Sequence, residues 1–184
     1  MIEDNGYQYD IDGDITYIYF TQENGMKHVV IIDTFNLERV INYKYRWHVS
    51  EYNCNNFYAR ANVYKGYNEE KGRGIYETLL LHTFIANNPD AKYIDHKNNN
   101  RLDERESNLR VTEQKNNTKN RKGKNINNTS GYRNVSLING WYRIQLQING
   151  TNYLFPEKFK DVDEAGKFAE EMRLKYYGEY AGHN

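Results

Sequence analysis

The segment Tyr93–Asn120, Y-I-D-H-K-N-N-N-R-L-D-E-R-E-S-N-L-R-V-T-E-Q-K-N-N-T-K-N, decides how the middle of this chain folds. Its first four residues and the later run Asn108–Thr112 are typical of two short strands, and the polar stretch Asn98–Ser107 joins them. The residues from 113 to 121 then begin a helix. Two short strands followed by a helix are the smallest scaffold that can hold a ββα-metal site.

The same segment places a carboxylate directly beside an imidazole, at Asp95 and His96. Asp95 offers the hard oxygen ligand that Mg²⁺ or Mn²⁺ prefers. Histidine is the side chain best suited to take a proton from water near neutral pH. Adjacent residues of a strand point to opposite faces, so this pair predicts a metal ligand on one side and a base on the other. One metal ion and one general base are enough to cut a phosphodiester.

The segment resembles the HNH nuclease motif of phage and intron-encoded homing endonucleases, through Asp-His, S-N-L-R-V-T and Q-K-N-N-T-K-N in this order and spacing. The resemblance implies a DNA endonuclease that depends on Mg²⁺ or Mn²⁺. Asp95 and Asn117 match the metal ligands of that family, and His96 matches the general base. Asn108 matches the central asparagine, which holds the long loop and orients the base.

Several neighbouring positions bear on this match. Asn116 is the alternative to Asn117 as the second metal ligand. The spacing favours Asn117, but a shift of one residue along the predicted helix would place Asn116 there. Asn120 lies one helical turn further and matches a supporting position. His82, in L-L-L-H-T-F-I, matches an L-H-R-like segment before the core, although a histidine beside an apolar run is more often simply packed. The family's D-N-R segment appears here as D-E-R, with Glu104 in its middle.

The formal net charge of the chain is +0, but the charge is unevenly distributed. Residues 1–90 carry 8 Lys and Arg against 13 Asp and Glu, whereas residues 97–145 carry 11 against 4. A locally basic stripe is what binding to phosphates requires, although a solvated surface has the same composition. The stripe predicts contacts with double-stranded DNA by Arg110, Lys119 and Arg121.

The end of the chain has the pattern of a three-stranded sheet and a helix. Residues 123–130 have the composition of a linker. Two Asn-Gly pairs, at 139–140 and 149–150, predict tight hairpin turns. Asp161 is a predicted N-cap, and Gly178 is predicted to end the helix. The predicted strands are Tyr132–Leu137, Trp141–Ile148 and Asn152–Phe155.

This region resembles the DNA-binding domain of plant APETALA/ethylene-response factors, through T-S-G-Y-R-N-V-S, W-Y-R-I-Q-L, E-A-G-K-F-A and Y-G-E-Y-A-G-H-N. In that family the sheet lies in the major groove. The resemblance implies DNA contacts by Arg133, Trp141, Arg143 and Gln145, since Arg pairs with guanine and Gln with adenine. Ordinary exposed strand residues are the alternative for each position.

The first part of the chain is rich in strand-forming residues. Asp14–Phe20 and His28–Asp33 predict a hairpin, and Ile75–Ile85 predicts a strand that runs into a short helix. This part of the chain also resembles the N-terminal region of phage HNH proteins, through the run I-I-D-T-F-N-L-E-R-V-I-N-Y-K-Y-R-W-H-V. The acidic balance here disfavours a phosphate-binding role, so we expect Trp47 and its neighbouring tyrosines to fill a small β core.

Composition narrows the class of protein. With 184 residues, 27% charged and 38% hydrophobic, the chain is expected to be soluble and folded. It lacks a membrane-spanning apolar run and a signal-peptide pattern. Cys54 is the only cysteine, which excludes an internal disulfide and predicts a reducing cytoplasm. The resemblance to phage nucleases implies that this is the cytoplasm of a bacterial host cell.

The sequence thus predicts an α+β protein with a β-rich domain at 1–78, an HNH core at 79–122, a linker at 123–130 and a DNA-binding domain at 131–184. We expect a monomer, and one active site per monomer predicts a nick. The main alternative is a DNA-binding regulator that keeps the HNH fold without cutting. An RNA-directed binder is a third interpretation.

Overall fold

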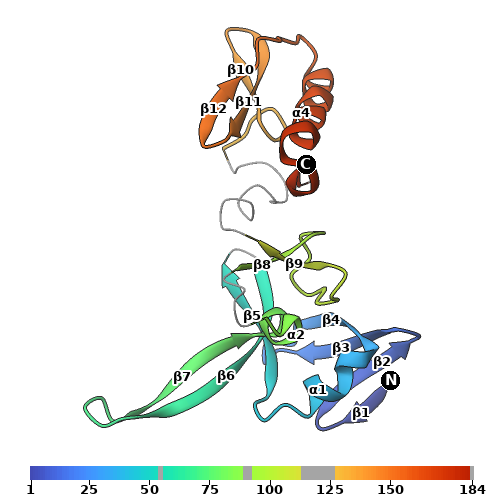
Figure 1. Ribbon diagram of the computed structural model, residues 1–184, viewed down its shortest axis with the longest axis vertical. Coiled ribbons are helices and arrows are strands. Elements are labelled where there is room, and N and C mark those ends of the chain that lie inside the picture. Colours follow the sequence, from blue (N-terminus) through green and yellow to red (C-terminus); the bar gives the residue numbers. More distant parts are fainter. Residues whose placement is uncertain (54–55, 89–92, 113–126, 183–184) are drawn as a thin grey trace. The chain divides into compact units, whose positions relative to one another are not determined.

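The computed structural model describes residues 1–53, 56–88, 93–112 and 127–182 (Figure 1). Over these residues the chain is mixed α+β, rich in strands, with four small sheets and few helices, which confirms the α+β class that the sequence predicted. It divides into two compact units. One comprises Met1–His96 and Asn100–Val111, and the other comprises Lys97–Asn99 and Thr112–Asn184.

The first unit begins with a four-stranded antiparallel meander in sequence order. Alternate residues such as Ile18, Val30 and Ile32 are fully buried, so one face of this sheet supplies the core. The short helices η1 (Thr34–Asn36) and α1 (Leu37–Ile41) follow it. The strands are β1 (Ile2–Asp4), β2 (Tyr7–Asp12), β3 (Ile15–Thr21) and β4 (Lys27–Asp33).

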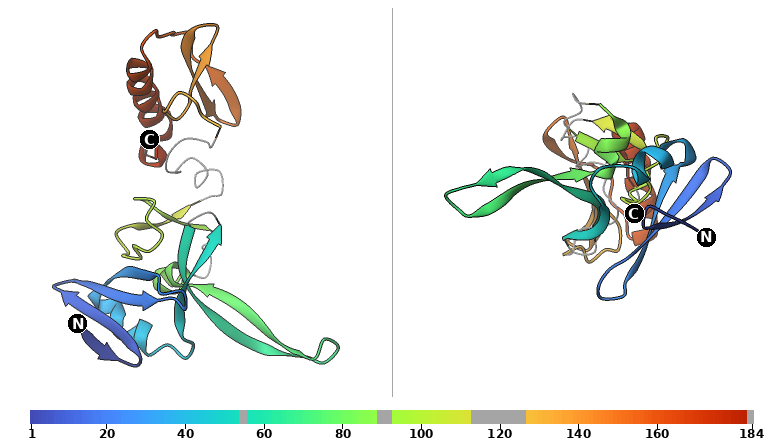
Figure 2. Two further views of the ribbon diagram at one scale, coloured as in Figure 1. Left: turned by 180° about the vertical axis from the view of Figure 1, so that it is seen from behind. Right: turned by 90° about the horizontal axis from the view of Figure 1, so that it is seen from below.

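A second antiparallel sheet orders β5 (Trp47–Asn53), β6 (Asn56–Asn68) and β7 (Arg73–Leu80). The far ends of β6 and β7 project from the first unit as a long hairpin (Figure 2). Helix α2 (Leu81–Ala86) continues directly from β7, as the run from Ile75 to Ile85 predicted.

One hydrophobic core holds the whole first unit together. Ile18 of β3 and Trp47 of β5 share it with Leu81 and Ile85 of α2 and with Leu109. The Trp47 indole is 1% exposed and donates a hydrogen bond to the carbonyl oxygen of Val40 at 3.0 Å. Residues that the sequence assigned to separate domains, 1–78 and 79–122, therefore fold around a common core.

A two-stranded sheet of β8 (Tyr93–His96) and β9 (Leu109–Thr112) carries the Asp-His pair. Part of the loop between these strands lies along β4. The Ile31 amide donates to the Leu102 carbonyl and the Glu104 amide donates to the Ile31 carbonyl, each at 2.8 Å. This backbone pairing fixes the Glu104 side chain relative to the β4 edge.

The second unit is a three-stranded antiparallel sheet packed on one helix. The two Asn-Gly turns lie between its strands, and Asp161 caps the helix by accepting from the Asp163 and Glu164 amides, which confirms both predictions. Ile144 and Leu146 pack against the helix residue Ala165. The elements are β10 (Val135–Ile138), β11 (Trp141–Ile148), β12 (Thr151–Leu154), α4 (Val162–Tyr177) and η2 (Gly178–Tyr180).

Gly166 gives a stability test of this packing. A Cβ atom built at Gly166 of α4 would lie 2.5–2.7 Å from the ring atoms Cδ1, Cε1 and Cγ of Tyr132. Gly166→Ala should destabilise the second unit by about 1–2 kcal/mol, because overpacking of about 1–3 kcal/mol outweighs a helix-propensity gain of up to about 1 kcal/mol. Urea unfolding of this variant and of the exposed Lys167→Ala would measure the difference. A stabilised Gly166→Ala variant would contradict the close approach.

Candidate active site

Three buried side chains that can bind a metal or move a proton converge in the first unit. His82 comes from the first turn of α2, His96 ends β8, and Glu104 lies in the loop that follows. One potential ligand atom of each lies within 4.8 Å of the others, so the cluster could hold a metal ion. Their exposed fractions are 6%, 5% and 0%. Among the described residues, no other group of three His, Cys, Asp or Glu side chains meets this criterion.

Glu104 is the centre of this cluster. Its Oε2 lies 3.0 Å from Nε2 of His96, which is hydrogen-bonding distance, and 3.9 Å from Nδ1 of His82. The two imidazole rings are 5.1 Å apart and nearly perpendicular, at 89°. One carboxylate oxygen thus faces a nitrogen from each histidine.

Burial dominates the electrostatics of the cluster. Desolvation lowers the pKa of His82 and the pKa of His96 to about 4, and it raises the pKa of Glu104 to about 8. The nearby carboxylates of Glu104 and Asp95 act in the opposite direction on His82 and His96 respectively. Both imidazoles are therefore neutral near pH 7, and a neutral imidazole has the lone pair that a proton acceptor or a metal ligand needs.

Asp95 has a different partner from its neighbour His96. Its Oδ2 accepts from Nε of Arg110 at 3.0 Å and from Nη2 of Arg110 at 2.7 Å. Both side chains are buried, with exposed fractions of 7% for Asp95 and 8% for Arg110. Alternation along β8 thus separates the two side chains, as the sequence predicted. Arg110, which was predicted to contact DNA, lies in this buried ion pair.

Asn108 ties the loop back on itself. Its Nδ2 donates to the Asp103 carbonyl at 2.7 Å, and its backbone amide donates to the Arg105 carbonyl at 2.9 Å. The Asp103 carboxylate accepts from Nε and Nη2 of Arg105, both at 2.7 Å. These bonds flank Glu104 on both sides and hold its backbone in place.

The structure brings together only part of the predicted site. Asp95, His96 and Asn108 lie in one two-stranded sheet and its loop, and His82 joins them from α2. Glu104 was identified in the sequence only as a departure from the D-N-R pattern. The available signal was a carboxylate in place of an amide, eight residues after the candidate base. The positions predicted on the following helix, Asn116, Asn117, Lys119, Asn120 and Arg121, lie outside the described residues.

The residues predicted to contact DNA in the second unit differ in exposure. Arg133 is 3% exposed, and its Nη1 donates to the Ala181 carbonyl at 3.1 Å, so its guanidinium faces the interior. Trp141, Arg143 and Gln145 alternate along β11 with the buried Ile144 and Leu146, which places them on the sheet face away from α4. Gln145 is exposed, and Nη2 of Arg143 donates to the Phe155 carbonyl at 2.9 Å.

Two lysines lie near the Trp141 ring. Nζ of Lys160 is 3.8 Å from the ring centroid and Nζ of Lys158 is 5.7 Å from it. The ring therefore lies beside two cations at the first residue of the central strand β11.

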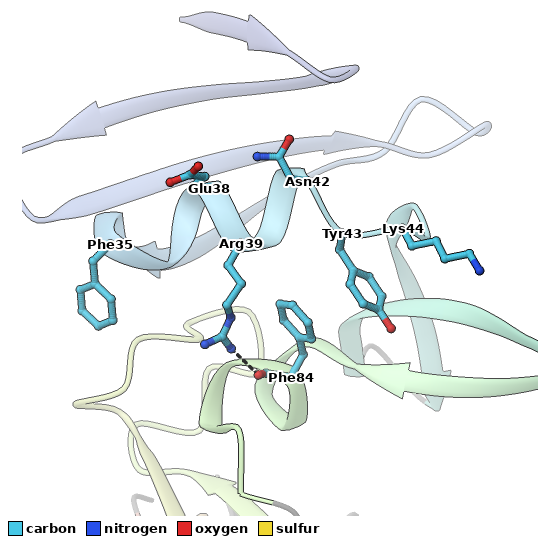
Figure 3. A pocket seen from close by; sticks show the side chains of 7 residues that line it. All are labelled: Phe35, Glu38, Arg39, Asn42, Tyr43, Lys44 and Phe84. Atoms are coloured by element: carbon cyan, nitrogen blue, oxygen red, sulfur yellow. Dashed lines mark hydrogen bonds between the residues drawn. The ribbon is translucent and has the colours of Figure 1, made fainter.

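A separate pocket of the first unit lies beside α1 (Figure 3). Arg39 extends across it, and its Nη2 donates to the Phe84 carbonyl. Only Glu38 among the lining residues is a carboxylate, and the lining contains no histidine or cysteine. The lining residues are Phe35, Glu38, Arg39, Asn42, Tyr43, Lys44 and Phe84.

Comparison of the chain with protein-family models, with curated proteins and with solved structures gave no match. Among the helices that the structure describes, none is long and apolar enough to cross a membrane.

Proposed function

We propose that this chain is a divalent-metal-dependent endonuclease that hydrolyses phosphodiester bonds in DNA. The single observation that carries the proposal is the position of His96: a neutral, buried imidazole at the end of β8, in contact with Glu104 and next in sequence to the Asp95 carboxylate. Such an imidazole is unprotonated at neutral pH, as a general base must be before it takes a proton, and a hard oxygen ligand lies one residue away.

Glu104 orients the imidazole in the proposed reaction. In the ionised form of Glu104, which its pKa of about 8 makes the main form in mildly alkaline solution, the carboxylate accepts from Nε2–H of His96 across their 3.0 Å contact, and the basic lone pair of the ring is then on Nδ1. His96 then takes the proton of a water molecule through Nδ1 as that water attacks the phosphorus in line. The bonds of Asn108 within the loop keep Glu104, and through it the ring, in one orientation.

Asp95 has the chemistry of a ligand for a hard cation. The Arg110 guanidinium donates two hydrogen bonds to Oδ2 and places a positive charge beside this buried carboxylate. Asp95 and Asn117 would hold Mg²⁺ or Mn²⁺, which when bound stabilises the negative charge that develops on the phosphate and on the leaving 3′-oxygen.

The second unit supplies surfaces for holding DNA in this proposal. The open face of its sheet carries the exposed Gln145 and the partly buried Arg143, whose side-chain types pair with adenine and guanine edges. Trp141 with Lys160 and Lys158 adds an aromatic ring with two cations beside it. A locally basic composition over residues 97–145 suits the phosphate backbone.

Incubation with supercoiled plasmid and phage DNA tests the proposal. We expect nicked product in Mg²⁺ or Mn²⁺, none in EDTA, and none with Asp95→Asn, which keeps the shape of the side chain but removes its charge. Asp12→Asn changes an exposed carboxylate of the same kind and should cut like the wild type. Duplex binding without cleavage of any DNA tested, including a random-sequence library, would favour the non-cleaving regulator. Stronger binding to RNA than to duplex DNA would favour the RNA-directed interpretation.

A further inference from the structure

We propose that His82, His96 and Glu104 form a binding site for a first-row transition-metal ion of the Zn²⁺ class, separate from the Mg²⁺ or Mn²⁺ position at Asp95. Two imidazoles and one carboxylate are a known donor set for zinc with a fourth position left open. The three ligands come from α2, from the end of β8 and from a loop bound to β4, so separate parts of the first unit meet there.

The distances suit a small ion. Metal–ligand bonds of about 2.0–2.1 Å at tetrahedral angles place ligand atoms about 3.3 Å apart. Oε2 of Glu104 lies 3.0 Å from Nε2 of His96 and 3.9 Å from Nδ1 of His82, one slightly closer and one slightly further than this spacing. The Ile31 carbonyl already holds the loop backbone at Glu104. Only small rotations of the three side chains would then be needed to bring their ligand atoms onto one ion.

Two atoms of the cluster have unmet bonding capacity. Within the described part of the chain, Nδ1 of His82 and Oε1 of Glu104 are buried and have no hydrogen-bond partner. A buried polar atom without a partner usually costs about as much as a lost hydrogen bond, so native proteins rarely leave two in one cluster. An ion bound by Nδ1 of His82 and by both oxygens of the Glu104 carboxylate would give both of these atoms a partner.

The donor atoms select the class of metal. Imidazole nitrogen suits Zn²⁺, Co²⁺, Ni²⁺ and Cu²⁺, whereas Mg²⁺ prefers oxygen ligands and keeps most of its water. The rings of His82 and His96 supply two of the three ligands, so Mg²⁺ should compete poorly here.

Occupation of this site would switch off the base, a consequence that rests on the proposed nuclease function. A metal on Nε2 of His96 takes the place of the proton between Nε2 and Glu104. The ring proton then lies on Nδ1, and the imidazole has no lone pair left for the attacking water. Zn²⁺ should therefore inhibit Mg²⁺-dependent cleavage at concentrations that fill the site.

Metal binding can be measured without DNA. Tag-free protein, stripped with a chelator, would be titrated with Co²⁺ in the absence and in the presence of excess Mg²⁺, and followed by the visible bands of four-coordinate Co²⁺. We expect one Co²⁺ per chain, displaced by Zn²⁺ but not by Mg²⁺, and a thermal midpoint raised by several degrees when the site is filled. X-ray absorption of the zinc form of the wild type should show two imidazole ligands.

Matched variants locate the site. His82→Gln and Glu104→Gln keep side-chain size and should weaken binding more than tenfold. His28→Gln changes another buried histidine with an unpartnered nitrogen, and Glu106→Gln changes a nearby carboxylate, so both should bind like the wild type. No binding by the wild type, equal binding by His82→Gln and Glu104→Gln, or fewer than two imidazoles in the absorption spectrum would overturn the site. The absorption test remains decisive if a variant does not fold.

The two proposals can fail separately. Stoichiometric Co²⁺ binding that depends on His82 and Glu104, in a protein that never cuts DNA in Mg²⁺, would keep this site and remove the nuclease. Mg²⁺-dependent cleavage in a protein that binds no Co²⁺ would keep the nuclease and remove this site.

Discussion

Replacement of His96 by alanine should reduce DNA cleavage by roughly 10²–10⁴-fold and leave duplex affinity nearly unchanged, because a general base typically contributes an acceleration of that size. His96 is 5% exposed and contacts Glu104, so it offers little surface for DNA binding. Single-turnover cleavage at saturating Mg²⁺, together with a binding titration on the same duplex, would separate the chemical step from affinity.

The controls for this variant must exclude a folding defect. Removal of the imidazole leaves the buried Glu104 without its hydrogen-bond partner, which costs about 1–3 kcal/mol of stability. Circular dichroism and urea unfolding of His96→Ala and His96→Gln would show whether the first unit still folds. His28→Ala removes another buried histidine and should keep the wild-type rate. Wild-type cleavage by folded His96→Ala would exclude His96 as the base.

Local chemistry explains which parts of the fold were predictable from the sequence. The Asn-Gly turns, the Asp161 cap and the β7-to-α2 run each depend on residues close together in the chain, and each is present. The strands β1 and β2 were not predicted, because Asp10, Asp12 and nearby glycines interrupt the apolar pattern around Tyr7 and Tyr9. Helix α1 has only five residues, too few for a helical period to show.

The candidate site was predictable only where its residues are neighbours in sequence. Asp95 and His96 are adjacent, and the alternation of a strand separates them. The position of Glu104 depends on backbone pairing with Ile31, and that of His82 depends on a core shared with β3 and β5. Both are long-range contacts that no local pattern contains. The ion pair of Arg110 was also not predicted, because its partner Asp95 lies fifteen residues away.

Arg110→Ala should destabilise the first unit by about 3–5 kcal/mol, because it leaves the Asp95 carboxylate buried without its counter-charge. The pair is 7% and 8% exposed, so solvent screens it little. Lys65→Ala breaks an ion pair of similar length, 2.7 Å to Glu77, in which both side chains are more than half exposed, and should leave stability unchanged. Urea unfolding of both variants measures the contrast, and equal stability of Arg110→Ala and Lys65→Ala would refute the buried pair.

A double-mutant cycle then separates the two roles assigned to Asp95. The double variant Asp95→Asn/Arg110→Met replaces the ion pair by neutral groups. Its loss of unfolding free energy should be smaller than the summed losses of the two single variants, by about 0.5–3 kcal/mol. If Asp95 serves only to balance Arg110, the double variant should recover cleavage along with stability. If Asp95 is a metal ligand, the double variant should fold and still fail to cut in Mg²⁺. The proposed function requires the second result, since neutralisation of Arg110 restores the fold but not the carboxylate oxygen that the cation needs.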